Sequence, residues 1–161
     1  MRATTGLLIL TTIGVGAPVR AQRLSDDDAR IAGYTLTLDN VHKAVAASKQ
    51  IHKLRLADPA LNQALLATTE GNLDAQMKAL DRVAPVAKAI AGVGLSTRDY
   101  SLTMVALSRA WLAAQAAEGP AGAGERAGVS NAQLAFIKQH RAELQKAIDE
   151  LSALGREDPP S

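Results

Sequence analysis

Residues 130–155, SNAQLAFIKQHRAELQKAIDELSALG, carry the most regular apolar pattern of the chain. Their apolar residues recur at alternating intervals of three and four, a spacing that aligns side chains on one face of a helix. Such a stripe is typical of packed antiparallel helices. Ser130 and Gln133 have the spacing of a capping box, and Gly155 can end the helix. We predict one helix over 130–154, with a stripe made of Leu134, Ile137, Arg141, Leu144, Ile148 and Leu151.

The residues upstream predict further helices, separated by capping residues and prolines. Thr37, Asp58 and Asn72 can each act as an N-cap, because their side-chain oxygens can accept a hydrogen bond from the first helical turn. Pro85 either kinks one helix or separates it from a short helix that ends at Ala91. The predicted helices, apart from this short one, cover 38–56, 59–70, 73–84 and 97–117.

The stretch GVGLSTRDYS, residues 92–101, resembles an anion-binding loop at first sight. Its glycines have the spacing of a dinucleotide loop, but Thr97 stands where the third glycine belongs, no strand precedes it and no P-loop lysine follows. Gly94 suits a left-handed helix stop, and Ser96 with Asp99 suits a capping box. We therefore interpret the stretch as the join between two helices.

These elements predict an all-α fold: a single antiparallel bundle of about five helices over residues 37–155. Residues 22–36 are expected to form a loose N-terminal segment, in which YTLTL (34–38) lies extended against the bundle. Four glycines and a proline within 118–128 predict a flexible loop. Residues 156–161 are expected to be a disordered tail.

Residues 1–21 have the pattern of a cleavable secretory signal peptide. Arg2 provides the positive start, and Ala3 to Val19 carries no charge. The sequence VRA at 19–21 presents acceptable residues to a signal peptidase, so that Gln22 would begin the mature chain. We expect a periplasmic or secreted protein. The alternative is an uncleaved N-terminal segment, which would be the only attachment to a membrane.

The charge balance argues against nucleic acid as a partner. The chain has 18 basic and 16 acidic residues, and cleavage after residue 21 removes Arg2 and Arg20 but no acid. The mature chain then has a formal net charge of zero, whereas nucleic-acid binding needs a clustered basic face.

The sequence also lacks the usual patterns of metal and nucleophilic sites. There is no cysteine, and His42 and His52 are ten residues apart although ligand pairs on one helix need a spacing of three or four. We expect His42, His52 and His140 to be solvated, and we predict no metal, no cofactor and no catalytic residue. The acidic run at 26–28 lacks the other ligands of a calcium loop, which favours a solvated charge run.

A few residues are weak candidates for contact with a ligand or a partner: Arg98, Tyr100, Trp111 and Arg141. Tyr100 and Trp111 lie on one helical stripe with Met104 and are two of the four aromatic residues in the chain. They either line a cleft for an apolar molecule or belong to the core, and we favour the core. Arg141 interrupts an apolar stripe, so it either reaches solvent or meets an acid from another helix.

Three phrases carry a loose resemblance to uncharacterised secreted bacterial proteins of an all-helical type. They are YTLTLDNV (34–41), GVGLSTRDYSLTMVAL (92–107) and NAQLAFIKQHRAEL (131–144). The resemblance implies export and a helical fold, but no activity and no site residues.

Three functions remain open from the sequence. The favoured one is a non-enzymatic exported binding or interaction domain for a protein partner or a small apolar ligand. The second is a small enzyme that uses acids and arginines on facing helices, and it requires a cluster that includes Arg98, Asp99 or Arg141. The third is a structural protein that self-associates through an exposed apolar face of the helix over 130–154.

Overall fold

The computed structural model describes residues 25–66, 72–118 and 128–156, and within them the protein is all-helical. This confirms the predicted fold class, although the described residues form more helices than the five or so expected. The expected signal peptide (1–21), the tail beyond Arg156 and most of the loop at 118–128 lie outside the described residues. The helices are α1 (Asp26–Ala32), α2 (Leu38–Ala57), α3 (Pro59–Leu66), α4 (Leu73–Arg82), α5 (Ala84–Gly92), α6 (Thr97–Glu118), α7 (Asn131–Gln139) and α8 (Arg141–Arg156).

Most helix starts follow the predicted capping chemistry. The side-chain oxygens of Thr37 and Asn72 accept hydrogen bonds from the backbone N–H groups three residues further on. Ser130 and Gln133 form the complete capping box at the start of α7. Pro85 separates α4 from α5 and does not kink a single helix, which settles the alternative that the sequence left open.

The stretch at 92–101 is the join between α5 and α6. Gly94 has a φ of 78°, the left-handed conformation that glycine adopts without steric penalty. The Ser96 hydroxyl accepts a hydrogen bond from the Asp99 backbone N–H and donates one to the Asp99 carboxylate over 2.6 Å. Leu95, between Gly94 and Ser96, is buried in the second core, so its side chain anchors this join to the interior of the protein.

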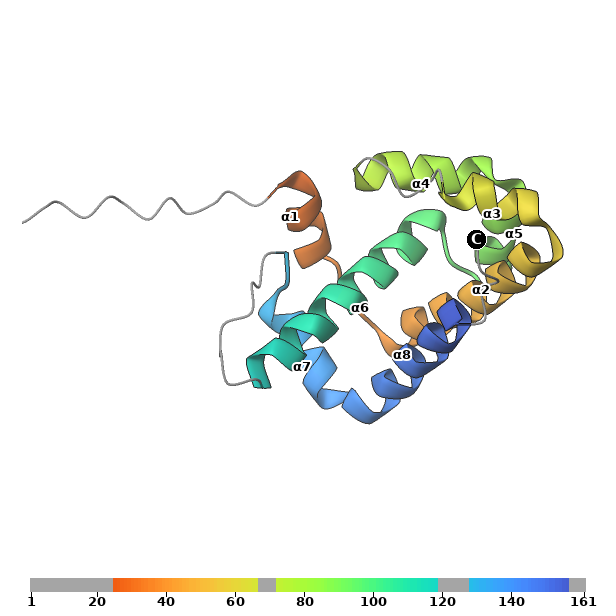
Figure 1. The fold of residues 1–161 in the computed structure, drawn as a ribbon. Coiled ribbons are helices and arrows are strands. Elements are labelled where there is room, and N and C mark those ends of the chain that lie inside the picture. Colours follow the sequence, from red (N-terminus) through yellow and green to blue (C-terminus); the bar gives the residue numbers. More distant parts are fainter. Residues whose placement is uncertain (1–24, 67–71, 119–127, 157–161) are drawn as a thin grey trace, which may run out of the picture.

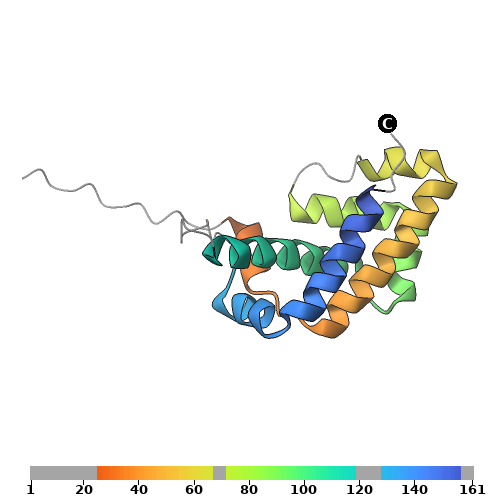
Figure 2. The ribbon, with the colours of Figure 1, turned by 60° about the horizontal axis from the view of Figure 1, so that its bottom comes forward.

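Helix α6 crosses the middle of the molecule, with α1 and α7 beside its C-terminal half (Figure 1). Helices α2 and α8 lie side by side and cross over it (Figure 2). The buried side chains form two clusters. The first core joins segments from α1 to α8 and comprises Ile31, Leu36, Val41, Val45, Leu73, Met77, Leu102, Ala106, Leu107, Ala110, Trp111, Ile137, Leu144 and Ala147.

The second core is confined to the middle of the chain. It lies between α2, α3, α5 and the start of α6, and all of its buried residues fall between positions 44 and 95. Its buried members are Ala44, Ala47, Ile51, Leu61, Val86, Ala89, Ile90 and Leu95. Helices α2 and α6 contact both cores, because Tyr100 and Met104 of α6 pack against the second core while Leu107 and Trp111 belong to the first.

The structure corrects the prediction of one helix over 130–154. The chain turns at His140, which closes α7 by donating its N–H to the Phe136 carbonyl and opens α8 by accepting from the Leu144 N–H. Ile137 and Leu144 are buried on the two sides of the turn. The apolar spacing therefore continues through a change of direction, because both helices bury the same stripe in the first core.

The N-terminal segment also differs from the loose lead-in that we expected. Residues 26–32 form α1, capped by a box between Ser25 and Asp28, and its Ile31 is only 2% exposed. The extended stretch after it packs as predicted, with Leu36 buried. Gln133 holds this segment in place, because its side-chain amide donates to the carbonyls of Ile31 and Tyr34 over 2.7 and 2.9 Å.

The acidic run at 26–28 is not a simply solvated charge run. Asp28 pairs with Arg109 of α6, and Asp27 accepts a hydrogen bond from the Leu73 backbone N–H at the start of α4. Gly128 approaches the Asp28–Arg109 pair so closely that a Cβ at this position would lie 2.5 Å from Arg109 Nη1. These contacts tie α1 to two helices distant in sequence.

Within the described ranges, no helix combines the length and the apolar character that crossing a membrane requires.

Candidate functional site

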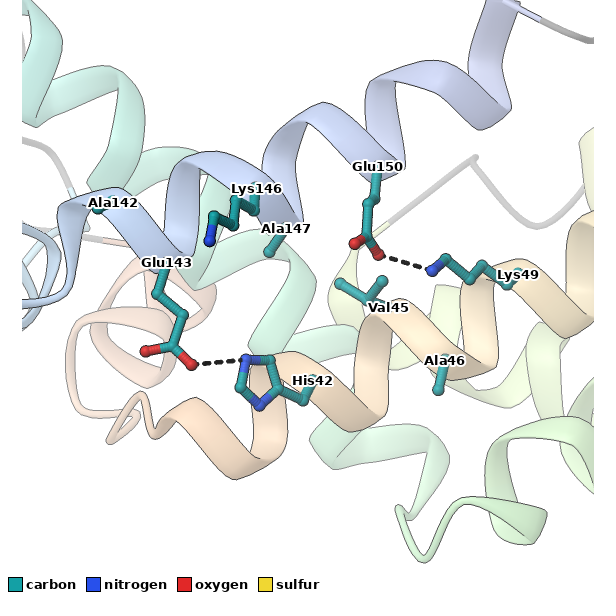
Figure 3. A pocket seen from close by; sticks show the side chains of 9 residues that line it. All are labelled: His42, Val45, Ala46, Lys49, Ala142, Glu143, Lys146, Ala147 and Glu150. Atoms are coloured by element: carbon teal, nitrogen blue, oxygen red, sulfur yellow. Dashed lines mark ion pairs between the residues drawn. The ribbon is translucent and has the colours of Figure 1, made fainter.

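The candidate site is an open groove between α2 and α8, with a volume of about 590 Å³ (Figure 3). It brings together parts of the chain that are about a hundred residues apart in sequence. Its lining residues are His42, Val45, Ala46 and Lys49 from α2, with Ala142, Glu143, Lys146, Ala147 and Glu150 from α8.

Small side chains line the bottom of this groove. Val45 and Ala147 are each 6% exposed and belong to the first core, while Ala46 and Ala142 are more exposed. Other lining residues recur at intervals of three and four, His42, Val45 and Lys49 on α2 and Glu143, Lys146 and Glu150 on α8, which places them on the facing sides of the two helices. The remaining lining residues, His42, Lys49, Glu143, Lys146 and Glu150, have larger polar side chains.

Two ion pairs bridge the groove, one toward each end of the lining (Figure 3). His42 Nε2 lies 3.1 Å from Glu143 Oε1, and Lys49 Nζ lies 2.7 Å from Glu150 Oε2. All four side chains are about half exposed. Lys146 lies on α8 between the two acids and makes no ion pair within the described residues.

Because the pairs are well solvated, each contributes little to the free energy of unfolding. A charged group that enters the groove can therefore replace one partner of either ion pair at little cost in stability. The groove thus offers an apolar bottom between walls that carry both signs of charge.

Two of the predicted candidates, Trp111 and Arg141, lie together. The Arg141 guanidinium carbon is 6.0 Å from the centroid of the Trp111 ring, which is within reach of a cation–π contact. Trp111 is buried in the first core, whereas Arg141 is exposed at the first position of α8. Arg141 thus lies at the surface over an aromatic ring, which explains how a charged residue can interrupt the apolar stripe.

The other two candidates lie elsewhere. The Tyr100 hydroxyl is hydrogen-bonded to the Ser48 hydroxyl over 3.0 Å, and the ring packs against the second core. Burial raises the pKa of the Tyr100 hydroxyl, and the hydrogen bond with Ser48 partly opposes this. Arg98 is exposed at the start of α6, about 20 Å along that helix from Trp111 at 1.5 Å per residue.

These positions bear on the alternatives that the sequence left open. Of the residues that the enzyme hypothesis names, the Asp99 carboxylate accepts a hydrogen bond from Ser96 and Arg141 lies over Trp111, so these two residues belong to different places in the fold. Tyr100 and Met104 pack against the second core, whereas Trp111 is buried in the first.

The self-association hypothesis needs a large apolar surface on α7 or α8. In the described part of the chain, the large apolar side chains that are exposed are Leu56 of α2 and Leu112 of α6. The apolar stripe of α7 and α8 is instead directed into the first core.

The histidines are only partly as predicted. His42 is 56% exposed in its side chain, whereas His52 is 5% exposed and therefore buried, which corrects the expectation that it is solvated. The described residues contain no group of three histidine, cysteine or acidic side chains that could hold a metal ion.

The groove residues themselves were missed by the sequence analysis. They look like ordinary solvated positions of two amphipathic helices, and this holds for His42, Lys49 and Lys146 as well as for Glu143 and Glu150. No sequence pattern marks them as a site, because nothing in one sequence says that these two helices face each other.

No protein-family model, no curated protein and no solved structure matches the chain.

Proposed function

We propose that the protein is a non-enzymatic binding protein and that the α2–α8 groove receives a segment of a protein partner. The observation that carries the proposal is the groove itself, with small side chains at its bottom and both signs of charge on its walls. A polypeptide segment offers a complementary surface, because it can place small apolar side chains between the helices and charged side chains of either sign along the rim.

The acidic residues on the walls of the groove favour a protein partner over a polyanion. A nucleic acid or another polyanion would face Glu143 and Glu150 as well as the cationic groups. Like charges brought together at an interface oppose binding, so acids on the wall select against such a partner.

We further propose that the helices act as one antiparallel bundle, supported by the fact that α2 and α6 each contact both cores. A single cooperative unfolding transition, seen alike by circular dichroism and by Trp111 fluorescence, is the expected behaviour.

We also propose that the protein works after export, on the strength of the sequence pattern over 1–21. Mass spectrometry of the protein recovered from the cell envelope or the medium should find a chain that begins at Gln22. A full-length chain in the membrane fraction would instead support an uncleaved anchor.

Site-specific photo-cross-linking tests the groove. A photoreactive residue replaces Ala46 in one variant and Ala142 in another, since both line the groove without belonging to the buried core. Irradiation of the cells that make the protein should give the same discrete adduct from both positions. The matched control carries the photoreactive residue at Gln145, which is exposed on α8 outside the groove lining.

Blocking the groove completes the test. Ala142→Trp in the variant with the probe at position 46 should remove the adduct, because the indole occupies the space between the helices. An adduct that persists in the blocked variant, or that forms equally from position 145, would contradict the proposal.

A further inference from the structure

A second groove runs between α2 and α5, with a volume of about 640 Å³. This volume lies within the range of roughly 300–1,000 Å³ that is usual for small-molecule sites. It is lined by Gln50, Lys53 and Leu54 from α2 and by Pro85, Lys88, Ala89 and Gly92 from α5.

The body of this groove is apolar, and Gly92 lies at one end of its α5 lining. Leu54, Pro85 and Ala89 provide the apolar lining, and Ala89 belongs to the second core. Gly92 has no side chain to close the groove, and a Cβ built there would meet no heavy atom within 4 Å. The lining of α5 from Pro85 to Gly92 extends over about 10 Å at the rise of an α-helix.

The charges of this groove differ in kind from those of the α2–α8 groove. Lys53 and Lys88 lie on opposite walls and are both exposed. No acidic residue lines the groove, and within the described residues neither ammonium group makes an ion pair. Lys53 and Lys88 therefore flank an apolar groove without an acidic partner within its lining.

We propose that the α2–α5 groove binds one long-chain carboxylate, independently of the protein partner at the α2–α8 groove. The alkyl chain lies along Leu54, Pro85 and Ala89, and the carboxylate sits between Lys53 and Lys88. Burial of the chain supplies affinity through the hydrophobic effect, and the lysines select an anionic head group.

A monomeric carboxylate fits this groove better than a membrane surface does. Binding to a bilayer interface requires a broad apolar face that can enter the acyl region. Here the apolar lining lies between two helices, and the large apolar side chains that the described residues expose, Leu56 and Leu112, are not part of it.

Titration calorimetry with dodecanoate, below its micelle concentration, tests the proposal on the protein purified from the cells that make it. Saturable binding of one dodecanoate per chain is expected. Dodecyltrimethylammonium has the same chain with the opposite charge, and acetate has the head group alone. Each should bind at least about tenfold more weakly, which corresponds to about 1.4 kcal/mol.

Two glycine variants separate the groove from non-specific uptake. Gly92→Leu places a side chain among the lining residues of the groove and should weaken dodecanoate binding at least about tenfold. Gly155→Leu is the matched control, because a Cβ at Gly155 of α8 also meets no heavy atom within 4 Å. It should leave binding unchanged.

The head-group contact is tested by Lys53→Ala together with Lys88→Ala. The double variant should lose most of the preference for dodecanoate over dodecyltrimethylammonium. Lys138→Ala, at an exposed position of α7, should keep this preference. Circular dichroism confirms that each variant is folded.

Equal binding of the two amphiphiles by the unmodified protein would overturn the proposal, as would full affinity in Gly92→Leu. Binding to anionic phospholipid vesicles but not to free dodecanoate would assign the groove to a membrane surface instead. None of these results bears on the cross-linking at Ala46, so the two proposals can fail separately.

Discussion

The two cores of the molecule are built on different principles. The first core joins residues from Ile31 to Ala147, and polar contacts hold its most distant segments together. The second core uses only residues 44–95, and three of its eight buried members are alanines, which let the helices approach closely. Bringing distant segments together costs more chain entropy than packing neighbouring helices, so the first core needs larger side chains and specific hydrogen bonds.

Substitution of the polar residues in the first core should lower the free energy of unfolding more than the other changes proposed below. Gln133→Met keeps the length of the side chain but removes its three hydrogen bonds, which reach the Ile31 and Tyr34 carbonyls and the Ser130 N–H. Because Gln133 is 2% exposed, the groups left behind lose their partners. We expect unfolding in denaturant to require about 2–3 kcal/mol less free energy.

Hydrogen exchange locates the effect of this substitution. Amides of α1 and the stretch after it should exchange faster in Gln133→Met, while those of α5 in the second core should keep their protection. Gln139→Met, at an exposed position of the same helix, serves as the control. Equal loss of protection in both cores would mean that the hydrogen bonds of Gln133 do not stabilise the first core in particular.

The second core should tolerate enlargement poorly. Ala47 has 0% exposure between α2 and its neighbours, and Ala47→Leu would force the helices apart. We expect a loss of about 1–3 kcal/mol in chemical denaturation. Ala57→Leu at the exposed end of α2 should change stability by no more than about 0.5 kcal/mol. A neutral Ala47→Leu would show that small side chains are not what brings these helices together.

The contrast between the cores also explains what the sequence could predict. Helix starts depend on local chemistry, so Thr37, Asn72 and Ser130 were recognised, whereas the sequence left open whether Pro85 kinks one helix or separates two. The same rule applied to Ser25 and Asp28 would have identified α1. It was overlooked because the segment is short and polar and owes its stability to Gln133, about a hundred residues away.

The turn at His140 and the groove between α2 and α8 could not be read from the pattern. Apolar spacing reports which side of a helix is buried, not the direction in which the helix runs, so a stripe can continue through a turn that has no glycine or proline. The pairing of His42 with Glu143 depends on which helices are neighbours. The packing of the first core as a whole determines that α2 and α8 are neighbours.

The Asp28–Arg109 pair should make the stability of the first core depend on acid pH. The hydrogen bond from Arg109, followed by that with Ser25, lowers the pKa of the Asp28 carboxyl in the folded protein. Its contribution is therefore complete above the unfolded pKa of about 3.9 and is lost as the pH falls through the folded value. Denaturation midpoints should show Asp28→Asn less stable than the unmodified protein at pH 7, with the difference shrinking below about pH 4.

Asp26→Asn provides the control for this pH dependence. Asp26 is exposed in the same turn of α1, and its substitution removes the same charge. If the two substitutions have the same effect at both pH values, the Arg109 contact does not stabilise the first core.

The smallest effect on stability is expected at the groove. Glu143→Gln and Glu150→Gln together remove both ion pairs between α2 and α8, but these side chains are about half exposed. We expect a change within about 1 kcal/mol in chemical denaturation, because solvent screens such pairs. Cross-linking from Ala46 should nevertheless fall, since the partner loses the acidic half of the rim. A large loss of stability would mean that the pairs serve the fold, and the charges would then be no argument for a binding site.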